Sequence, residues 1–193
     1  MAATVALVAM AATSFAPQAS AQPTARFFDP VSKQWQDIGP GRHHGKSPIQ
    51  KEVVSYDGPY GANTIIVDTT ERRLYYVMGD GKALKYGVGV GREGFQWAGT
   101  HRVTRKAEWP GWTPPPAMRK RQPGLPAHME GGPNNPLGAR ALYIGNTFYR
   151  IHGSNEPWTI GSAVSSGCIR MTNDDVMDLY ERVNVGTKVV VRR

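Results

Sequence analysis

The sequence predicts an all-β or β-rich domain with long loops, preceded by an N-terminal extension. With 22 glycines and 15 prolines in 193 residues, many turns are expected. From residue 63 onward, short apolar runs alternate with turn-forming residues, a pattern typical of a meander of hairpins. The length suits one domain plus an extension.

The expected strands follow one another closely from residue 64. Residues 64–68 read Thr-Ile-Ile-Val-Asp, and a polar turn at 70–73 leads to the apolar run 74–78. A Gly-Asp-Gly turn then precedes a run of alternating small and apolar residues, which indicates another hairpin strand. The strands expected after the first two cover residues 84–90, 99–104, 141–144, 147–152 and 189–191.

One helix is expected after residue 172. Thr172 is a suitable N-cap, and Asp175 occupies the capping-box position three residues later. The apolar residues that follow recur at helical spacing and form one face: Val176, Leu179, Tyr180 and Val183. The Asn-Val-Gly run at residues 184–186 should end the helix.

The run Gly-Val-Gly-Arg-Glu-Gly at residues 89–94 matches a dinucleotide-binding fingerprint on paper. The residues that follow, Phe-Gln-Trp-Ala-Gly, do not open a helix, and no βαβ unit surrounds the run. Because the fingerprint needs that context, close packing of a hairpin is the better interpretation of these glycines.

Residues 108–136 are expected to form a functional loop or lid, because prolines exclude long regular structure. The segment contains Trp109 and Trp112, and six Lys or Arg residues lie between positions 101 and 121. Aromatic and basic residues together can bind nucleic acid, or line a cleft for a carboxylate-bearing peptide or glycan. Export of the protein would favour the cleft.

Residues 1–21 have the composition of a secretory signal. An apolar segment at 5–12 is followed by Ala-Ser-Ala at 19–21, which suits cleavage before Gln22. A basic n-region is missing, because no Lys or Arg precedes Arg26. Residues 22–60 then form a polar extension, in which His43 and His44 are better explained by a solvated linker than by a metal site.

Charge and hydropathy constrain the partners. The net charge is +8 and favours an acidic partner, such as a phosphate-rich polymer, an anionic membrane surface or a carboxylate-rich wall. No apolar run after the signal is long enough to span a bilayer. We therefore expect an exported protein of the periplasm or cell envelope with no transmembrane segment.

The sequence places its single cysteine, Cys168, sixteen residues after His152. A thiol attacks acyl groups as the thiolate, and a nearby imidazole is the usual base. The alternative is a small buried cysteine with no chemical role. An unpaired cysteine in an oxidising compartment favours the functional interpretation.

The neighbours of these two residues supply candidates for the remaining roles. The second ring nitrogen of His152 could be held by a backbone carbonyl near Gly153 or by the Ser154 hydroxyl. Gly167 would let the amides of residues 167 and 168 turn toward an oxyanion. Arg170 suits a substrate carboxylate or could fix the loop. The other histidines show no metal-ligand spacing with Cys168: His43, His44, His101 and His128.

Taken together, these motifs resemble the L,D-transpeptidase (YkuD-type) catalytic domain family. That family has a histidine followed by Gly-Ser or Gly-Thr, a gap of mid-teens length, then Ser-His-Gly-Cys and an apolar residue. Here the match is His-Gly-Ser at 152–154 and Ser-Ser-Gly-Cys-Ile-Arg at 165–170. The strand near 86–91, the helix after Thr172 and the Gly-Thr-Lys-Val ending are also similar, so that about residues 60–193 are covered.

The resemblance implies a mainly β, sandwich-like fold over residues 61–193, with one C-terminal helix and the Pro/Trp-rich segment as a lid. It implies that Cys168 is the nucleophile and His152 the base, that Gly153 supplies the orienting carbonyl, and that Gly167 and Cys168 supply oxyanion amides. Ser166 replaces the family's usual histidine and still offers a hydrogen bond.

The implied reaction takes a peptidoglycan tetrapeptide, releases its terminal D-Ala and forms a 3→3 cross-link. Arg170, Trp109 and Trp112 are candidate substrate-binding residues, with Ser154 and Ser166 as positioning candidates; no cofactor, metal or nucleic acid is expected. Alternatives are transfer to an envelope protein lysine, hydrolysis by water, or a non-catalytic wall-binding module.

Overall fold

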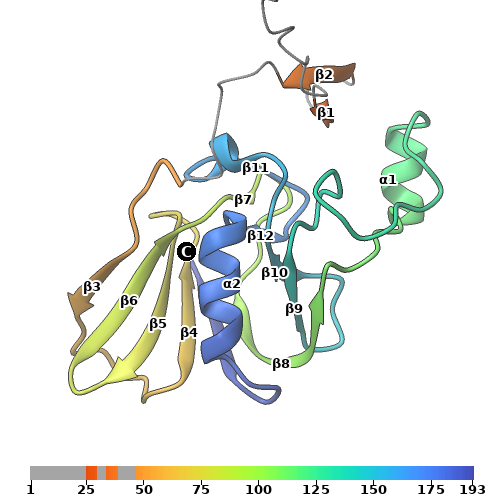
Figure 1. Cartoon of the computed structure of the whole chain (residues 1–193). Coiled ribbons are helices and arrows are strands. Elements are labelled where there is room, and N and C mark those ends of the chain that lie inside the picture. Colours follow the sequence, from red (N-terminus) through yellow and green to blue (C-terminus); the bar gives the residue numbers. More distant parts are fainter. Residues whose placement is uncertain (1–24, 30–33, 39–46) are drawn as a thin grey trace, which may run out of the picture.

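The computed structural model describes residues 25–29, 34–38 and 47–193. The signal-like segment 1–21 and the pair His43 and His44 lie outside these residues. Strands β1 (Ala25–Asp29) and β2 (Gln34–Ile38) pair with each other in antiparallel register. The remaining elements form a mainly β structure with one main helix, α2 (Asn173–Arg182) (Figure 1), which confirms the expected fold class.

A nine-stranded sheet organises the fold, in the order β12-β10-β9-β8-β13-β4-β5-β6-β3. Its pairings are antiparallel except for β13 with β4 and β10 with β12, which are parallel. The strands are β3 (Glu52–Ser55), β4 (Thr64–Asp68), β5 (Arg73–Gly79), β6 (Lys82–Gly87), β8 (Gly99–Glu108), β9 (Arg140–Ile144), β10 (Arg150–His152), β12 (Ile169–Arg170) and β13 (Lys188–Arg192).

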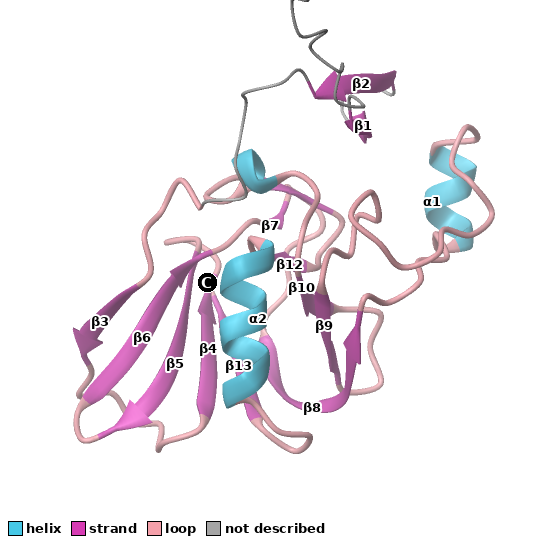
Figure 2. Cartoon of the chain, in the orientation of Figure 1, coloured by secondary structure: helices cyan, strands magenta, loops and turns pink. Residues whose placement is uncertain are grey.

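Smaller elements complete the structure. Strands β7 (Val90–Gly91) and β11 (Ala163–Ser165) form a separate parallel pair. A 3-10 turn covers Pro157–Thr159, and a short helix, α1 (Pro116–Arg121), interrupts the long loop between β8 and β9 (Figure 2). The loop at 108–136 is therefore irregular, as expected, apart from this helix and a bridge between Trp112 and Met129.

The expected strands are present, with three differences. The strand expected at residues 84–90 ends at Gly87 in β6, and Val90 belongs to the separate strand β7. Strand β8 continues to Glu108, and β10 begins only at Arg150 because a turn occupies residues 145–148. Strand β3 lies in the segment expected to be a polar extension, and it pairs with β6 at the edge of the sheet. Most of β3 is exposed, so its sequence lacks the apolar alternation that identifies half-buried strands.

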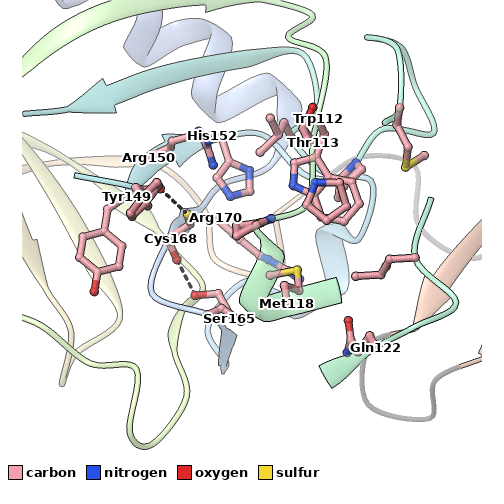
Figure 3. A pocket seen from close by; sticks show the side chains of 18 of the residues that line it. Trp112, Thr113, Met118, Gln122, Tyr149, Arg150, His152, Ser165, Cys168 and Arg170 are labelled. Atoms are coloured by element: carbon pink, nitrogen blue, oxygen red, sulfur yellow. Dashed lines mark hydrogen bonds between the residues drawn. The ribbon is translucent and has the colours of Figure 1, made fainter. Parts of the chain in front are cut away.

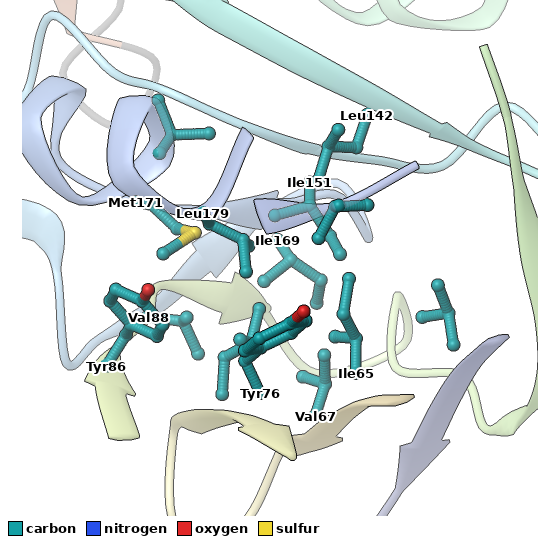
Figure 4. Close-up of a cluster of buried hydrophobic side chains, with 14 of the residues drawn as sticks. Ile65, Val67, Tyr76, Tyr86, Val88, Leu142, Ile151, Ile169, Met171 and Leu179 are labelled. Atoms are coloured by element: carbon teal, nitrogen blue, oxygen red, sulfur yellow. The ribbon is translucent and has the colours of Figure 1, made fainter. Parts of the chain in front are cut away.

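The main core lies between the sheet and α2 (Figure 4). Thr172 caps the helix by accepting a hydrogen bond from the Asp175 amide, which confirms the expected N-cap. Val176, Leu179 and Val183 are fully buried, and burial of each such side chain stabilises the fold by about 1.5–3 kcal/mol. The helix contacts β9 and β10, so it supports the strand that ends at His152.

The glycine run at residues 89–94 does not open a helix, as expected. The expected hairpin is wrong, because β7 pairs in parallel with β11, but two glycines of the run do pack closely. A Cβ on Gly91 would lie 2.4 Å from the Phe95 carbonyl oxygen, and one on Gly89 would lie 3.1 Å from the Thr159 carbonyl oxygen. These glycines therefore allow β7 to approach the loops beside Cys168.

Candidate active site

The parallel pair β10 and β12 forms one wall of the site. Its register joins Ile151 to Ile169 and His152 to Arg170. Because side chains alternate across a strand, the two isoleucines enter the core, where both are at most 1% exposed. The alternate side chains line a pocket of about 890 Å³ on the other face (Figure 3): Arg150, His152, Cys168 and Arg170.

His152 is held in one orientation within this wall. Its side chain is only 4% exposed, and Nδ1 lies 2.6 Å from the Gly153 carbonyl oxygen. Because a carbonyl can only accept, Nδ1 must carry the proton, which leaves Nε2 free to act as a base. Burial and the charges of Arg170 and Arg150 lower the pKa of His152 to about 3, against the opposing effect of the Gly153 hydrogen bond.

The structure distinguishes between the two candidates for orienting His152, the Gly153 carbonyl and the Ser154 hydroxyl. The Gly153 carbonyl accepts from the ring, whereas Ser154 Oγ accepts from the Glu156 amide at 2.9 Å. Gly153 also needs to lack a side chain, because a Cβ would lie 2.3 Å from Asn173 Oδ1. Ser154 thus helps to shape the loop after β10.

Cys168 is half-buried and free. Its Sγ lies 3.8 Å from the Phe148 carbonyl oxygen, which can accept a weak hydrogen bond from the thiol. Burial raises the pKa of Cys168, while the charge of Arg150 and hydrogen bonds at Arg150 oppose that rise. At neutral pH, Cys168 is therefore a neutral thiol and His152 a neutral imidazole. The thiol must lose its proton when the sulfur attacks a substrate.

The turn before Cys168 depends on Gly167, whose φ is +105°. Ser165 Oγ accepts from the Gly167 amide at 3.1 Å and donates to the Cys168 carbonyl oxygen at 2.6 Å. The Gly167 amide thus donates a hydrogen bond within the turn, and its role as an oxyanion donor stays a prediction. Of the two expected amides, that of Cys168 is the stronger candidate for this role, because the Gly167 amide already has an acceptor in the turn.

Two aromatic residues fix the same turn from outside. Trp97 Nε1 donates to the Gly167 carbonyl oxygen at 2.7 Å, and the indole stacks on Tyr149 with ring centroids 4.4 Å apart. A Cβ on Gly167 would lie 2.4 Å from Tyr149 Cε1. The stack therefore leaves room only for glycine at this position.

Arg170 is neutralised within the protein. Its Nη1 lies 2.6 Å from Glu156 Oε2, and the exposed fractions of the two side chains are 14% and 7%. Such an ion pair fixes the loop after β10 against β12. Of the two roles expected for Arg170, the structure therefore supports loop fixation.

The lid segment (residues 108–136) forms another side of the pocket. Trp112 exchanges backbone hydrogen bonds with Met129 and lines the pocket. Ser166, from the turn before Cys168, also lines the pocket. Trp109 is 42% exposed and is not among the lining residues. The structure therefore brings Trp112 and Ser166 to the pocket with Cys168, but not Trp109.

The sequence interpretation missed Arg150, Ser165 and Trp97. Arg150 lies two residues before His152, so strand alternation alone would have placed it on the same face. Ser165 could have been suspected from its place in the turn before Gly167. Trp97 gave no such signal, because its bond to Gly167 joins residues 70 positions apart.

Two further findings concern the described part of the chain. There, no group of three or more His, Cys, Asp or Glu residues is placed to hold a metal ion. No helix among the described residues is long and apolar enough to cross a membrane.

Comparison with known proteins identifies similar chains. Residues 62–191 match the model of the YkuD family, the L,D-transpeptidase catalytic domain. The probable L,D-transpeptidase ErfK/SrfK of Escherichia coli K12 is 43% identical over 136 residues, which are 66% of this chain and 43% of that protein. The chain thus spans less than half the length of this relative.

Solved structures share the fold. One described as a probable carnitine operon oxidoreductase from Brucella melitensis has 43% identity and a TM-score of 0.52, with 76% of this chain and 96% of that chain covered. An L,D-transpeptidase from Mycobacterium smegmatis has 21% identity and a TM-score of 0.52, with coverages of 67% and 58%. At that identity the second likeness concerns the fold alone.

Proposed function

Because the chain belongs to the L,D-transpeptidase catalytic domain family, we propose that it forms 3→3 cross-links between peptidoglycan stem peptides through a thioester on Cys168. The carrying observation is the pocket wall, where Cys168 and a neutral, oriented His152 face one cavity. A neutral imidazole with a free Nε2 is the form needed to accept the thiol proton.

In the first half-reaction, Cys168 Sγ attacks the carbonyl carbon of the third residue of the tetrapeptide, which is bonded to the nitrogen of the terminal D-Ala. The thiol proton passes to His152 Nε2, and the Cys168 amide donates to the developing oxyanion. When the tetrahedral intermediate collapses, the C–N bond breaks and His152 returns the proton to the amine of the departing D-Ala. A thioester remains on Cys168.

In the second half-reaction, an amine of a neighbouring stem peptide attacks the thioester. His152 accepts a proton from that amine, the new amide bond forms, and the proton returns to sulfur as the thiol leaves. The same thioester could be transferred to an envelope protein lysine or hydrolysed by water. Because the proposed substrate lies in the cell envelope, export to the periplasm or envelope is part of the proposal.

The basic lining of the pocket supports a carboxylate-bearing substrate. Arg92 and Arg121 both lie over the Phe95 ring, with guanidinium carbons 4.4 and 5.3 Å from its centroid. All three residues line the pocket that the lid segment encloses together with the sheet wall. Stem peptides carry several carboxylates, so cationic side chains at this place suit them.

The test is to incubate the purified protein with a muropeptide tetrapeptide and separate the products by chromatography with mass detection. We expect release of D-Ala together with a 3→3 dimer, and neither product from Cys168→Ala. A tripeptide without dimer would identify hydrolysis, and a conjugate formed when a lysine peptide is added would identify a protein acceptor. Absence of D-Ala release by the folded, reduced protein would contradict the proposal.

A further inference from the structure

Arg150 stands beside Cys168 in the pocket wall. The parallel register joins Ile151 to Ile169, so one step back along both chains brings Arg150 opposite Cys168. Both residues line the same pocket, and Figure 3 shows their side chains on the same face as His152. The sulfur that the proposed reaction ionises therefore has a guanidinium as its neighbour.

The two arginines of this wall differ in their partners. Arg170 forms a buried ion pair with Glu156. Arg150 forms no ion pair with any acidic residue of the described chain, and its buried Nε has no hydrogen-bond partner. Its guanidinium lies 5.2 Å from the centroid of the Tyr143 ring, a contact that does not neutralise charge. A partly buried cation without a counter-ion is costly, so an anion at this place would be stabilised.

We propose that Arg150 is a further catalytic residue, whose guanidinium holds the negative charge on Cys168 Sγ while His152 Nε2 accepts the proton. The S–H bond breaks, an N–H bond forms on His152, the electron pair stays on sulfur and Arg150 keeps its protons. This role rests on the proposed function of Cys168 as the nucleophile. It can be tested without substrate turnover.

The other charged groups around the sulfur do not replace Arg150. His152 stays neutral, because burial and the charges of Arg170 and Arg150 lower its pKa to about 3. The charge of Arg170 is largely balanced by Glu156. Arg92 and Arg121 line the pocket but stack on Phe95. The remaining titratable neighbour is Tyr149, which has no cationic form.

The experiment measures the rate of Cys168 alkylation by iodoacetamide as a function of pH, and the single cysteine makes the signal unambiguous. The neutral variants are Arg150→Met and Arg150→Gln. An opposite charge within about 4–6 Å lowers the pKa of an acidic group by about 1–3 units. We therefore expect both variants to raise the apparent pKa of alkylation by at least about one unit and to slow alkylation near neutral pH about tenfold. Arg150→Lys should restore part of the difference.

The matched control is Arg105→Met. Arg105 is exposed and lies over the same Tyr143 ring, at 3.6 Å from its centroid, so the variant removes a like charge and a like ring contact away from the pocket lining. We expect a wild-type profile. An equal shift in this control would overturn the proposal, because a general charge effect would then explain it.

A wild-type profile in either folded neutral variant would also overturn the proposal. If Arg150→Met does not fold, Arg150→Gln decides, since its amide keeps hydrogen-bond donors in the site. Should the profile shift as expected while the wild type forms no acyl-enzyme, the role of Arg150 stands and the proposed function fails. The two failures are therefore distinguishable.

Discussion

The sheet wall (residues 150–152 and 168–170) and the lid segment (residues 108–136) enclose the same pocket but are built differently. In the wall, Ile151 and Ile169 enter the core and His152 is 4% exposed. In the lid, helix α1 (Pro116–Arg121) has no buried residue and no side-chain N-cap. The wall therefore shares the stability of the core, whereas the helix of the lid buries none of its residues.

This difference separates two tasks. Acyl transfer needs the base, the nucleophile and the oxyanion donor held to within a fraction of an ångström, which a core-anchored wall provides. Admission and release of a branched substrate need a segment that can move at low cost, and segments with few buried contacts open most easily. We therefore expect changes in the wall to affect the rate of chemistry, and changes in the lid to affect KM.

Replacement of His152 by alanine should have the largest effect among the predictions about this contrast. Loss of a general base typically slows a reaction by 10²–10⁴, so we expect acylation about 10³-fold slower. Single-turnover acylation by a tetrapeptide, followed by mass spectrometry, measures this rate. An acylation rate within about threefold of the wild type would remove His152 from the role of base.

Gly167→Ala should destabilise the wall by about 3 kcal/mol, from left-handed backbone strain of about 1–2 kcal/mol and from overpacking against Tyr149. Gly186→Ala is a matched control, because Gly186 also has positive φ but a Cβ there would meet nothing within 4 Å. Gly186→Ala should therefore lower the free energy of unfolding only by the backbone strain, about 1–2 kcal/mol. Urea unfolding of both variants measures the difference, and equal losses would contradict the close packing at Gly167.

Acid should destabilise the wall through His152. Its pKa in the folded protein is about 3, below the ordinary value of 6.5, so between these values the unfolded chain binds a proton that the folded protein does not. Stability therefore falls as pH decreases through this window, by up to about 1.4 kcal/mol per pH unit. Urea unfolding at several pH values should show a shallower slope for His152→Gln than for the wild type. Identical slopes would argue against a buried neutral imidazole.

The lid should give the smallest effects, confined to substrate binding. Trp112 lines the pocket and Trp109 does not, so Trp112→Ala should raise KM up to about tenfold, as expected from loss of one aromatic contact. Trp109→Ala should change KM by less than about twofold. Steady-state kinetics of D-Ala release compares the two variants. A large fall in kcat with unchanged KM for Trp112→Ala would break the contrast between wall and lid.

The parts of the fold that local patterns determine could be predicted from the sequence. Strand β4 (Thr64–Asp68) has the expected bounds, and the Thr172 cap and the buried face of α2 follow from spacing within one segment. Strand β3 was missed because it is an exposed edge strand. Its place in the sheet depends on β6, about 30 residues away.

The site shows the same limit. The placement of His152 and Cys168 in one pocket could be predicted because each lies in a short motif. The residues alone left Gly153 and Ser154 as candidates for orienting His152, and only the family resemblance favoured the Gly153 carbonyl. The engagement of the Gly167 amide by Ser165, and the Trp97 stack on Tyr149, depend on how distant turns pack. No pattern within one segment determines such contacts. Arg150 is an intermediate case, since side-chain alternation along the strand from His152 could have indicated its place in the pocket.

The most direct test of the central claim is the intact mass of the protein after incubation with a muropeptide tetrapeptide, measured for the wild type and for Cys168→Ala. The account predicts a wild-type adduct equal to the tetrapeptide minus D-Ala, and no adduct on the variant. A folded, reduced wild type that forms no adduct, or a variant that carries the same adduct, would contradict the assignment of Cys168 as the nucleophile.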